Sequence, residues 1–176
     1  IAKAMCRNGL SRNKVTVIPH GIPKLKQLPA HTKQDEKTRF FYVGRICHIK
    51  GIHILLEAFS NINSPERAEL HIIGGAGNKS EQRYMKQLEE KYQASNIIWH
   101  GKVPAESIFD TIKEYDVMVH PTICLEIFGL NISEALSMNK PVLATRCGGA
   151  EIQIEDGVNG WLVKPNNVAG LRNKMN

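Results

Sequence analysis

Tyr115-Asp116-Val117-Met118-Val119-His120-Pro121 is an apolar run closed by a proline, and it predicts a buried strand. The segment from Asn131 to Met138 has the spacing of a helix, and Gly129 stands just before it. A helix that begins beside the carboxyl end of a strand offers unpaired backbone N–H groups and the positive end of its dipole. This stretch therefore predicts a site for an anion such as a diphosphate.

Two carboxylates flank this connection. Glu126 would lie on the loop over the anion site, and Glu134 about one turn into the helix. A carboxylate beside a phosphate needs another task, and accepting hydrogen bonds from sugar hydroxyls is the natural one. The alternative is two surface glutamates on an ordinary connection.

The composition fits one ordinary globular domain. The 176 residues are 42% hydrophobic and 23% charged, and no apolar run is long enough for a spanning helix. None of the four cysteines forms a C-x-x-C pair, which argues against zinc and favours a reduced, cytosolic protein. The net charge of +6 suits an anionic substrate, nucleic acid or an acidic membrane face. The scattered basic residues lack interleaved aromatic residues, which disfavours nucleic acid.

Strands alternate with helices along the chain. We expect strands at 15–18, 39–43, 69–73, 96–99, 115–121, 141–144 and 160–163, with helices at 49–62, 80–94 (Ser80 as N-cap), 104–112, 131–138 and near Ala150. This alternation predicts an α/β fold with a doubly wound, mostly parallel, Rossmann-like sheet. Residues 1–14 are expected to be a linker helix or the tail of a preceding domain. Residues 15–176 would form one domain, truncated within a helix at 168–176.

Ligands of such sheets bind at the carboxyl ends of the strands, so the following loops matter most. The first core strand is followed by Gly44, Arg45 and then Lys50. Two cations on one turn before a helix suit a diphosphate, and Gly44 would let the backbone approach it. The alternative is two solvated cations.

Other strand ends carry weaker signals. Gly74-Gly75-Ala76-Gly77 and Gly148-Gly149 indicate close approach to a ligand or to a neighbouring loop. Lys102 and Val103 follow the third core strand, where the loop backbone could hydrogen-bond a nucleobase edge or form a plain turn. The dispersed histidines, His120 included, are expected to be structural or surface residues, because no metal-ligand spacing appears.

Taken together, these segments resemble a known family. The matching motifs are Val17-Ile18-Pro19-His20-Gly21-Ile22, Tyr42-Val43-Gly44-Arg45 with Lys50-Gly51, Ile72-Ile73-Gly74-Gly75-Ala76-Gly77, Pro121 through Glu126-Ile127-Phe128-Gly129 to Glu134-Ala135-Leu136, Pro141-Val142-Leu143-Ala144-Thr145, Gly148-Gly149-Ala150-Glu151 and Asp156-Gly157-Val158-Asn159-Gly160-Trp161-Leu162-Val163. In this order, over roughly residues 15 to 171, they resemble the C-terminal donor-binding half of a GT-B retaining glycosyltransferase of the family 4, glycosyl transferases group 1, type. Asn139 stands where the family often has glycine, and asparagine tolerates a left-handed helix cap.

The resemblance implies roles for individual residues. Arg45 and Lys50 would hold the donor diphosphate and, with Glu126 on the sugar hydroxyls, form the catalytic set. Phe128, Gly129 and Leu130 would offer backbone amides to the phosphates or the sugar. Glu134 would bind the ribose, and Gly44, Lys102 and Val103 complete the donor site. No cofactor and no metal are expected.

The resemblance also implies partners. The substrate would be a nucleotide sugar such as GDP-mannose, UDP-glucose or UDP-GlcNAc, and the acceptor a glycan or a lipid-linked sugar. An N-terminal domain, absent from this sequence, would carry the acceptor site, so the isolated domain is expected to be inactive. The full-length protein would be cytoplasmic or peripheral at the inner membrane face. The alternatives are a GT-B nucleotide-sugar epimerase and a non-catalytic basic module that binds nucleic acid or protein.

Overall fold

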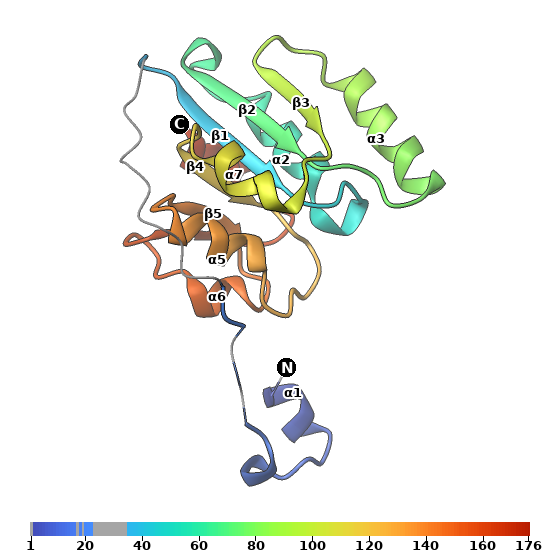
Figure 1. The fold of residues 1–176 in the computed structure, drawn as a ribbon, viewed down its shortest axis with the longest axis vertical. Coiled ribbons are helices and arrows are strands. Elements are labelled where there is room, and N and C mark those ends of the chain that lie inside the picture. Colours follow the sequence, from blue (N-terminus) through green and yellow to red (C-terminus); the bar gives the residue numbers. More distant parts are fainter. Residues whose placement is uncertain (1, 17, 19, 23–34) are drawn as a thin grey trace.

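A parallel sheet forms the centre of the chain (Figure 1). The structure is a computed structural model that describes residues 2–16, 18, 20–22 and 35–176. In these residues six strands pair in the order β3-β2-β1-β4-β5-β6, and every pairing is parallel. The strands are β1 Thr38–Val43, β2 Ala68–Ile73, β3 Ile97–Gly101, β4 Val117–His120, β5 Val142–Thr145 and β6 Gly160–Val163. This order is that of the doubly wound nucleotide-binding sheet, and the predicted fold class is confirmed.

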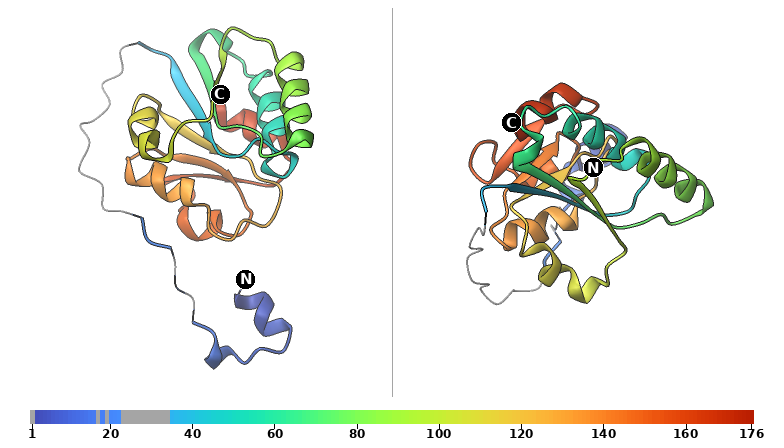
Figure 2. Two further views of the ribbon diagram at one scale, coloured as in Figure 1. Left: turned by 45° about the vertical axis from the view of Figure 1, so that its right-hand side comes forward. Right: turned by 90° about the horizontal axis from the view of Figure 1, so that it is seen from above.

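Helices cover both faces of the sheet (Figure 2). One face packs against α2 Ile52–Phe59, α3 Lys79–Lys91 and α7 Val168–Met175. The other face packs against α4 Ile108–Ile112, α5 Leu130–Ser137 and α6 Ala150–Gln153. The molecule therefore has three layers, with a hydrophobic core on each side of the sheet.

Strand β1 shows why the strands are apolar runs rather than alternating ones. Phe40 and Tyr42 pack into the core beneath α2, while Phe41 between them packs into the core beneath α4 and α5. All three side chains are buried. A parallel strand covered on both faces has no solvent-facing side, so its middle is a continuous apolar run.

The N-terminal residues lie apart from the sheet and its helices (Figures 1 and 2). They form α1 Ala2–Arg7 and a short 3₁₀ turn, Arg12–Lys14. Val15, Thr16 and Ile18, where a strand was expected, are not in a strand, and Val17 lies outside the described residues. Residues 23–34 also lie outside them. No helix in the described part of the chain is long and apolar enough to cross a membrane.

Two helix ends differ from expectation for local reasons. Asn78, rather than Ser80, caps α3, because its side-chain oxygen accepts a hydrogen bond from the backbone N–H of Glu81. Helix α2 begins at Ile52, after the 3₁₀ turn His48–Lys50, because Gly51 breaks the helix with a left-handed φ of 71°. The expected left-handed cap at Asn139 is confirmed by its φ of 56°.

Gly51 also packs against the loop after β4. A Cβ atom at this position would lie 2.0 Å from the carbonyl oxygen of Pro121, so no side chain fits. This contact brings the loop that carries Lys50 against the loop that carries Glu126. The loops after β1 and β4 are thus joined by backbone packing at the reversal of strand order.

We predict that Gly51→Ala destabilises the fold more than Gly101→Ala. Both glycines have a φ of 71°, but a Cβ at Gly101 meets nothing within 4 Å. The left-handed strain costs each variant about 1–2 kcal/mol, and the clash with Pro121 should cost Gly51→Ala about 1–3 kcal/mol more. Urea unfolding of both variants measures the difference, and equal losses would contradict the packing argument.

Candidate functional site

The candidate site lies between β1 and β4, where the strand order reverses. In a doubly wound sheet this switch point opens a crevice outside the carboxyl ends of the strands. Two pockets adjoin there and share Val43, Gly44 and Arg45. One has a volume of about 380 Å³ and the other about 330 Å³. Together they form one groove, which passes from the loops after β1, β2 and β3 to the start of α5.

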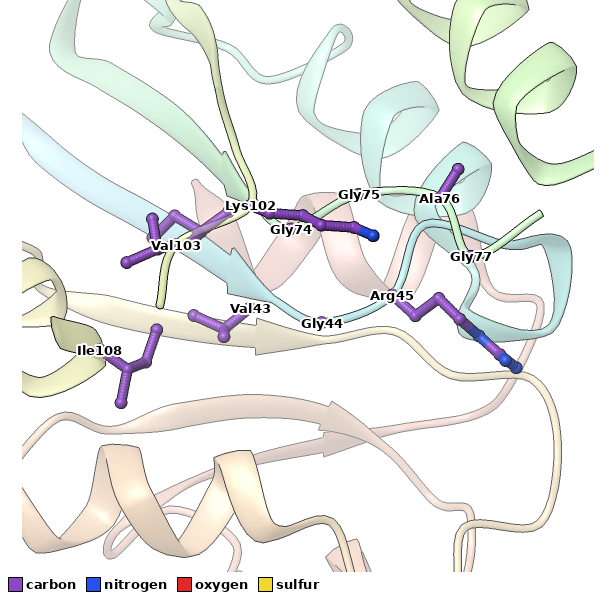
Figure 3. Close-up of a pocket in the computed structure, with 11 residues that line it drawn as sticks. Val43, Gly44, Arg45, Gly74, Gly75, Ala76, Gly77, Lys102, Val103 and Ile108 are labelled. Carbon is purple, nitrogen blue, oxygen red and sulfur yellow. The ribbon is translucent and has the colours of Figure 1, made fainter. Parts of the chain in front are cut away.

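The larger hollow, here called the glycine-loop pocket, lies among the loops after β1, β2 and β3 (Figure 3). Its lining is mostly backbone and apolar side chains: Val43, Gly44, Arg45, Ile73, Gly74, Gly75, Ala76, Gly77, Lys102, Val103 and Ile108. Figure 3 shows the Lys102 side chain running along Gly74 and Gly75. Lys102 and Val103, predicted from their place after the third core strand, do face this pocket.

The smaller hollow, here called the carboxylate pocket, contains most of the predicted polar groups. It is lined by Tyr42, Val43, Gly44, Arg45, Lys50, His120, Glu126, Gly129, Leu130, Asn131 and Glu134. Phe128 lines neither pocket, and its ring lies 5.4 Å from that of His20. The structure thus brings together all the predicted site residues except Phe128.

Lys50 and Glu126, which both line the carboxylate pocket, form an ion pair. The side chains are 24% and 19% exposed, so water screens the pair only in part. Arg45, in contrast, is 54% exposed, and its guanidinium lies 3.7 Å from Glu81 at the start of α3. Figure 3 shows it extending past Gly77. The two cations therefore flank the groove, each beside a carboxylate of its own.

Glu134 reaches the carboxylate pocket from α5. It is half-buried, and burial raises the pKa of its carboxyl group above the ordinary value. Helix α5 is held against β1 by Asn131, whose amide donates a hydrogen bond of 2.8 Å to the carbonyl of Val43. The helix N-terminus and Glu134 are thereby fixed relative to the loop that carries Arg45.

His120 is a member of this site that the sequence did not reveal. It ends β4 and lines the carboxylate pocket with a side chain only 3% exposed. Its Nε2 atom lies 3.9 Å from the Oε2 atom of Glu126, and neither ring nitrogen has a hydrogen-bond partner. Burial and the charge of Lys50 lower the pKa of His120 to about 4, against the favourable effect of Glu126. The ring is therefore neutral at pH 7.

Several polar side chains hold in place the loops that form the groove. Tyr42 donates its hydroxyl proton to the carbonyl of Arg45 at 2.7 Å, and Thr122 donates to the carbonyl of Ile49 at 3.1 Å. Gln153, on α6, donates to the carbonyl of Phe128 and accepts a hydrogen bond from Ser133. Sequence reasoning missed all three, because a lone hydroxyl or amide gives no sign of which distant carbonyl it will reach.

Gly148 and Gly149 pack against the loop that carries Glu126. The Glu126 N–H donates to the carbonyl of Cys147, and the Gly149 N–H donates to the carbonyl of Glu126 at 2.8 Å. A Cβ at Gly149 would lie 2.1 Å from the carbonyl oxygen of Phe128. The close approach predicted for this pair is therefore to the neighbouring loop, and it fixes the backbone of Glu126.

Among the described residues no group of three or more histidine, cysteine, aspartate or glutamate side chains is placed to hold a metal ion. The four cysteines are free thiols.

A doubly wound sheet with a polar groove at its switch point defines the Rossmann-like class of nucleotide-binding folds. The particular family follows from comparison. A model of the family described as Glycosyl transferases group 1 matches residues 24–176, and the chain belongs to this family. The resemblance predicted from the sequence motifs is confirmed.

Individual relatives support this assignment. A sucrose synthase of Thermosynechococcus vestitus is 30% identical over 80% of this chain and 19% of its own length. O-antigen chain mannosyltransferase C of Escherichia coli is 26% identical over 94% of this chain and 45% of its own. The chain thus spans less than half the length of these relatives.

Solved structures agree with the fold. Anabaena Alr3699/HepE in complex with UDP and glucose matches with a TM-score of 0.71 and 28% identity, over 80% of this chain and 38% of that one. The lipopolysaccharide outer core galactosyltransferase WaaB, in its apo form, matches with a TM-score of 0.77 and 23% identity, over 99% of this chain and 49% of that one. The described sheet and its helices are one half of the GT-B architecture.

We predict that His120 makes the fold sensitive to acid. Its pKa is about 4 in the folded chain and 6.5 ordinarily, so the unfolded chain takes up the proton first as the pH falls. Stability present at pH 7 is then lost between about pH 6.5 and 4, with a loss of about 2 kcal/mol by pH 5. His120→Leu should remove this part of the loss.

Urea unfolding at pH 7.5 and pH 5.0 tests this expectation. His53, His71 and His100, whose pKa values burial also lowers, act in the same direction in both proteins and cancel in the comparison. If wild type and His120→Leu lose equal stability between the two pH values, the neutral buried state of His120 is wrong.

Proposed function

We propose that this chain is the donor-binding half of a glycosyltransferase that moves a hexosyl group from a nucleoside diphosphate sugar to a glycan or lipid-linked acceptor, with retention of configuration. The observation that carries this proposal is the gathering of Lys50, Glu126 and Glu134 in one pocket beside the start of α5. The membership of the chain in Glycosyl transferases group 1 gives the reaction class.

The groove suggests how the donor would lie. The diphosphate would rest between Arg45, Lys50 and the backbone amides at Gly129 and Leu130, where cations and the start of a helix attract an anion. The hexosyl group would then meet Glu126 in the carboxylate pocket. The base would extend into the glycine-loop pocket near Lys102 and Val103, since its lining is largely apolar backbone and side chains.

The half-buried Glu134 would receive the ribose. Its raised pKa reflects a carboxylate with little solvation, and two ribose hydroxyls would supply the hydrogen bonds that water does not. Gly44, at the junction of the two pockets, would keep the backbone clear of the diphosphate.

The chemistry needs charge stabilisation on both sides of the breaking bond. As the sugar leaves, negative charge grows on the diphosphate and positive charge on the sugar carbon. Lys50 and Arg45 would stabilise the first, and the carboxylate of Glu126 the second. The two cations would serve the role that a divalent metal has in other phosphoryl and glycosyl sites, so we propose a reaction without metal or cofactor.

The relatives indicate the range of donors. HepE was solved with UDP and with UDP-glucose, and other relatives are named for O-antigen and colanic acid synthesis. We therefore propose a UDP- or GDP-hexose donor, UDP-glucose, UDP-GlcNAc and GDP-mannose among them, in polysaccharide assembly. The acceptor would be bound by a further domain, as in enzymes that close a cleft between two halves, and a lipid-linked acceptor would place the enzyme at a membrane surface.

We predict that Arg45→Ala and Lys50→Ala each weaken nucleoside diphosphate binding about tenfold or more, the loss expected for one charge-assisted contact of roughly 1.5–3 kcal/mol. Calorimetry with UDP, GDP and ADP, with and without EDTA, measures this. Arg67→Ala and Lys86→Ala, both exposed and remote from the groove, are the controls. Binding lost in EDTA would refute the metal-free proposal. Preference for a duplex oligonucleotide over every nucleotide would refute the function.

We predict opposite effects for the two glutamates. Glu134→Ala should weaken plain nucleoside diphosphate binding about tenfold, since it removes the acceptor of two ribose hydroxyls. Glu126→Ala should leave that affinity unchanged or make it tighter, because Lys50 then loses a competing carboxylate. In a complete enzyme Glu126→Ala should lower kcat. Glu90→Ala, exposed on α3, is the control. The reverse pattern in calorimetry would overturn these roles.

A further inference from the structure

His120 is a buried polar residue whose hydrogen bonds are missing. Its side chain is 3% exposed, and neither Nδ1 nor Nε2 has a partner in the described structure. Buried polar atoms in folded proteins are nearly always paired, because an unpaired one costs the fold its lost hydration. Three other histidines have at least one paired ring nitrogen: His53 pairs with Tyr84, and His71 pairs through Nδ1 with His100, although Nε2 of His71 is also without a hydrogen bond. The ring of His120 therefore needs an explanation that the fold does not supply.

The ring lines the carboxylate pocket, and its Nε2 atom faces a carboxylate. The gap of 3.9 Å between Nε2 and the Oε2 atom of Glu126 is too long for a direct hydrogen bond. An oxygen atom displaced to one side of that gap can lie about 2.8 Å from both atoms, which is hydrogen-bond distance. The site is thus spaced for one intervening oxygen.

The two groups on either side of the gap, the Glu126 carboxylate and the His120 imidazole, determine which kind of oxygen fits between them. A carboxylate only accepts hydrogen bonds, and the facing nitrogen of a neutral imidazole donates when it carries the proton. The neighbouring carboxylate favours the tautomer with the proton on Nε2. A hydroxyl group accepts one hydrogen bond and donates another, so it satisfies both sides at once. A carbonyl or phosphate oxygen cannot donate and would meet the negative charge of Glu126.

Lys50 is the third polar group beside the gap between His120 and Glu126. Its ammonium group contacts the same Oε2 atom of Glu126, and both charges act on the His120 ring. Burial, helped by the Lys50 charge, keeps the imidazole from taking up a proton, so His120 is not suited to act as an acid or base near pH 7. It is suited to recognise a neutral polar group.

We propose that His120 is a sugar-recognition residue: its Nε2–H donates a hydrogen bond to one hydroxyl of the transferred hexosyl group, and that hydroxyl donates to Glu126. This inference rests on the proposed function. A site that pairs a hydroxyl on both sides discriminates against a sugar lacking it, because the buried groups are then left unpaired. His120 would therefore help to select which hexose is accepted.

The test separates the sugar from the nucleotide. We expect His120→Leu to weaken binding of a nucleoside diphosphate hexose about tenfold while leaving the matching nucleoside diphosphate unchanged, measured by calorimetry on the 176-residue chain. His120→Gln, whose amide can donate, should recover part of the loss. Monodeoxy donor analogues should include one that binds about tenfold more weakly than its parent to wild type but equally well to His120→Leu.

Stability and a matched control distinguish recognition from structure. Removing an unpaired buried ring should leave the Tm of His120→Leu equal to or above that of wild type at pH 7.5. The control is Thr145→Val, because Thr145 is buried and donates to the backbone carbonyls of His120 and Thr122 but does not line the carboxylate pocket. This variant should lower the Tm and leave the ratio of sugar to nucleotide affinity unchanged.

NMR of the wild-type chain provides an independent test that does not depend on the folding of a variant. The ring nitrogen shifts of His120 in NMR should change on adding the nucleoside diphosphate hexose and not on adding the nucleoside diphosphate. Equal effects of both ligands, or deoxy penalties that all persist in His120→Leu, would overturn the proposal while leaving nucleotide-sugar binding intact. A wild-type chain that binds no nucleotide sugar would overturn the proposed function, and this inference with it.

Discussion

Backbone packing between loops is the constraint on which the rest of the site depends. Gly74 lies so close to Gly44 that a Cβ would come within 1.8 Å of its carbonyl oxygen, and Gly51 and Gly149 meet Pro121 and Phe128 in the same way. Each contact joins loops that follow different strands. Because no side chain intervenes, these loops cannot shift by rotamer changes, and the groove between them is largely preformed.

In the preformed groove, the charges of Lys50 and Glu126 neutralise each other before a ligand binds. Water reaches this pair only in part. An arriving diphosphate would bring negative charge toward Glu126, which is unfavourable unless Lys50 lies between the two. The ammonium group can contact both at once, since it has three donors. Keeping Lys50 on Glu126 therefore holds the cation near its proposed place before the substrate arrives.

Much of the fold could be predicted from the sequence, because it rests on local patterns. Apolar runs between polar turns locate the strands, and their alternation with helices implies a parallel, doubly wound sheet. The helix ends differ from the predicted ones where a nearby residue is the better cap, as at α3, which is capped by Asn78 and not by Ser80. For the site, Lys50, Glu126 and Glu134 could be found because charged residues just after buried strands lie at one edge of the sheet.

The parts that could not be predicted depend on distances across the fold. His120 looks like any histidine at the end of a strand, and only its burial opposite Glu126 sets it apart. Gly148 and Gly149 resemble a ligand-binding turn, yet they support the loop of Glu126. Gln153 reaches the carbonyl of Phe128 from another helix. Each role is fixed by tertiary placement, of which a sequence pattern carries no trace.

The apolar, cationic and hydrogen-bonding parts of the groove follow one another in an order that favours one orientation of the proposed donor. The glycine-loop pocket ends in Val103 and Ile108, which suits a flat base better than a hydrated sugar. Arg45 lies at the junction of the two pockets, and Lys50 lines the carboxylate pocket. The hydrogen-bonding groups of Glu126 and His120 line the same pocket. A nucleotide sugar has the same order of base, diphosphate and sugar. Reversing it would place hydroxyls against apolar walls and a base against Glu126, so in the proposed binding mode the sugar end would lie beside Glu126 and His120.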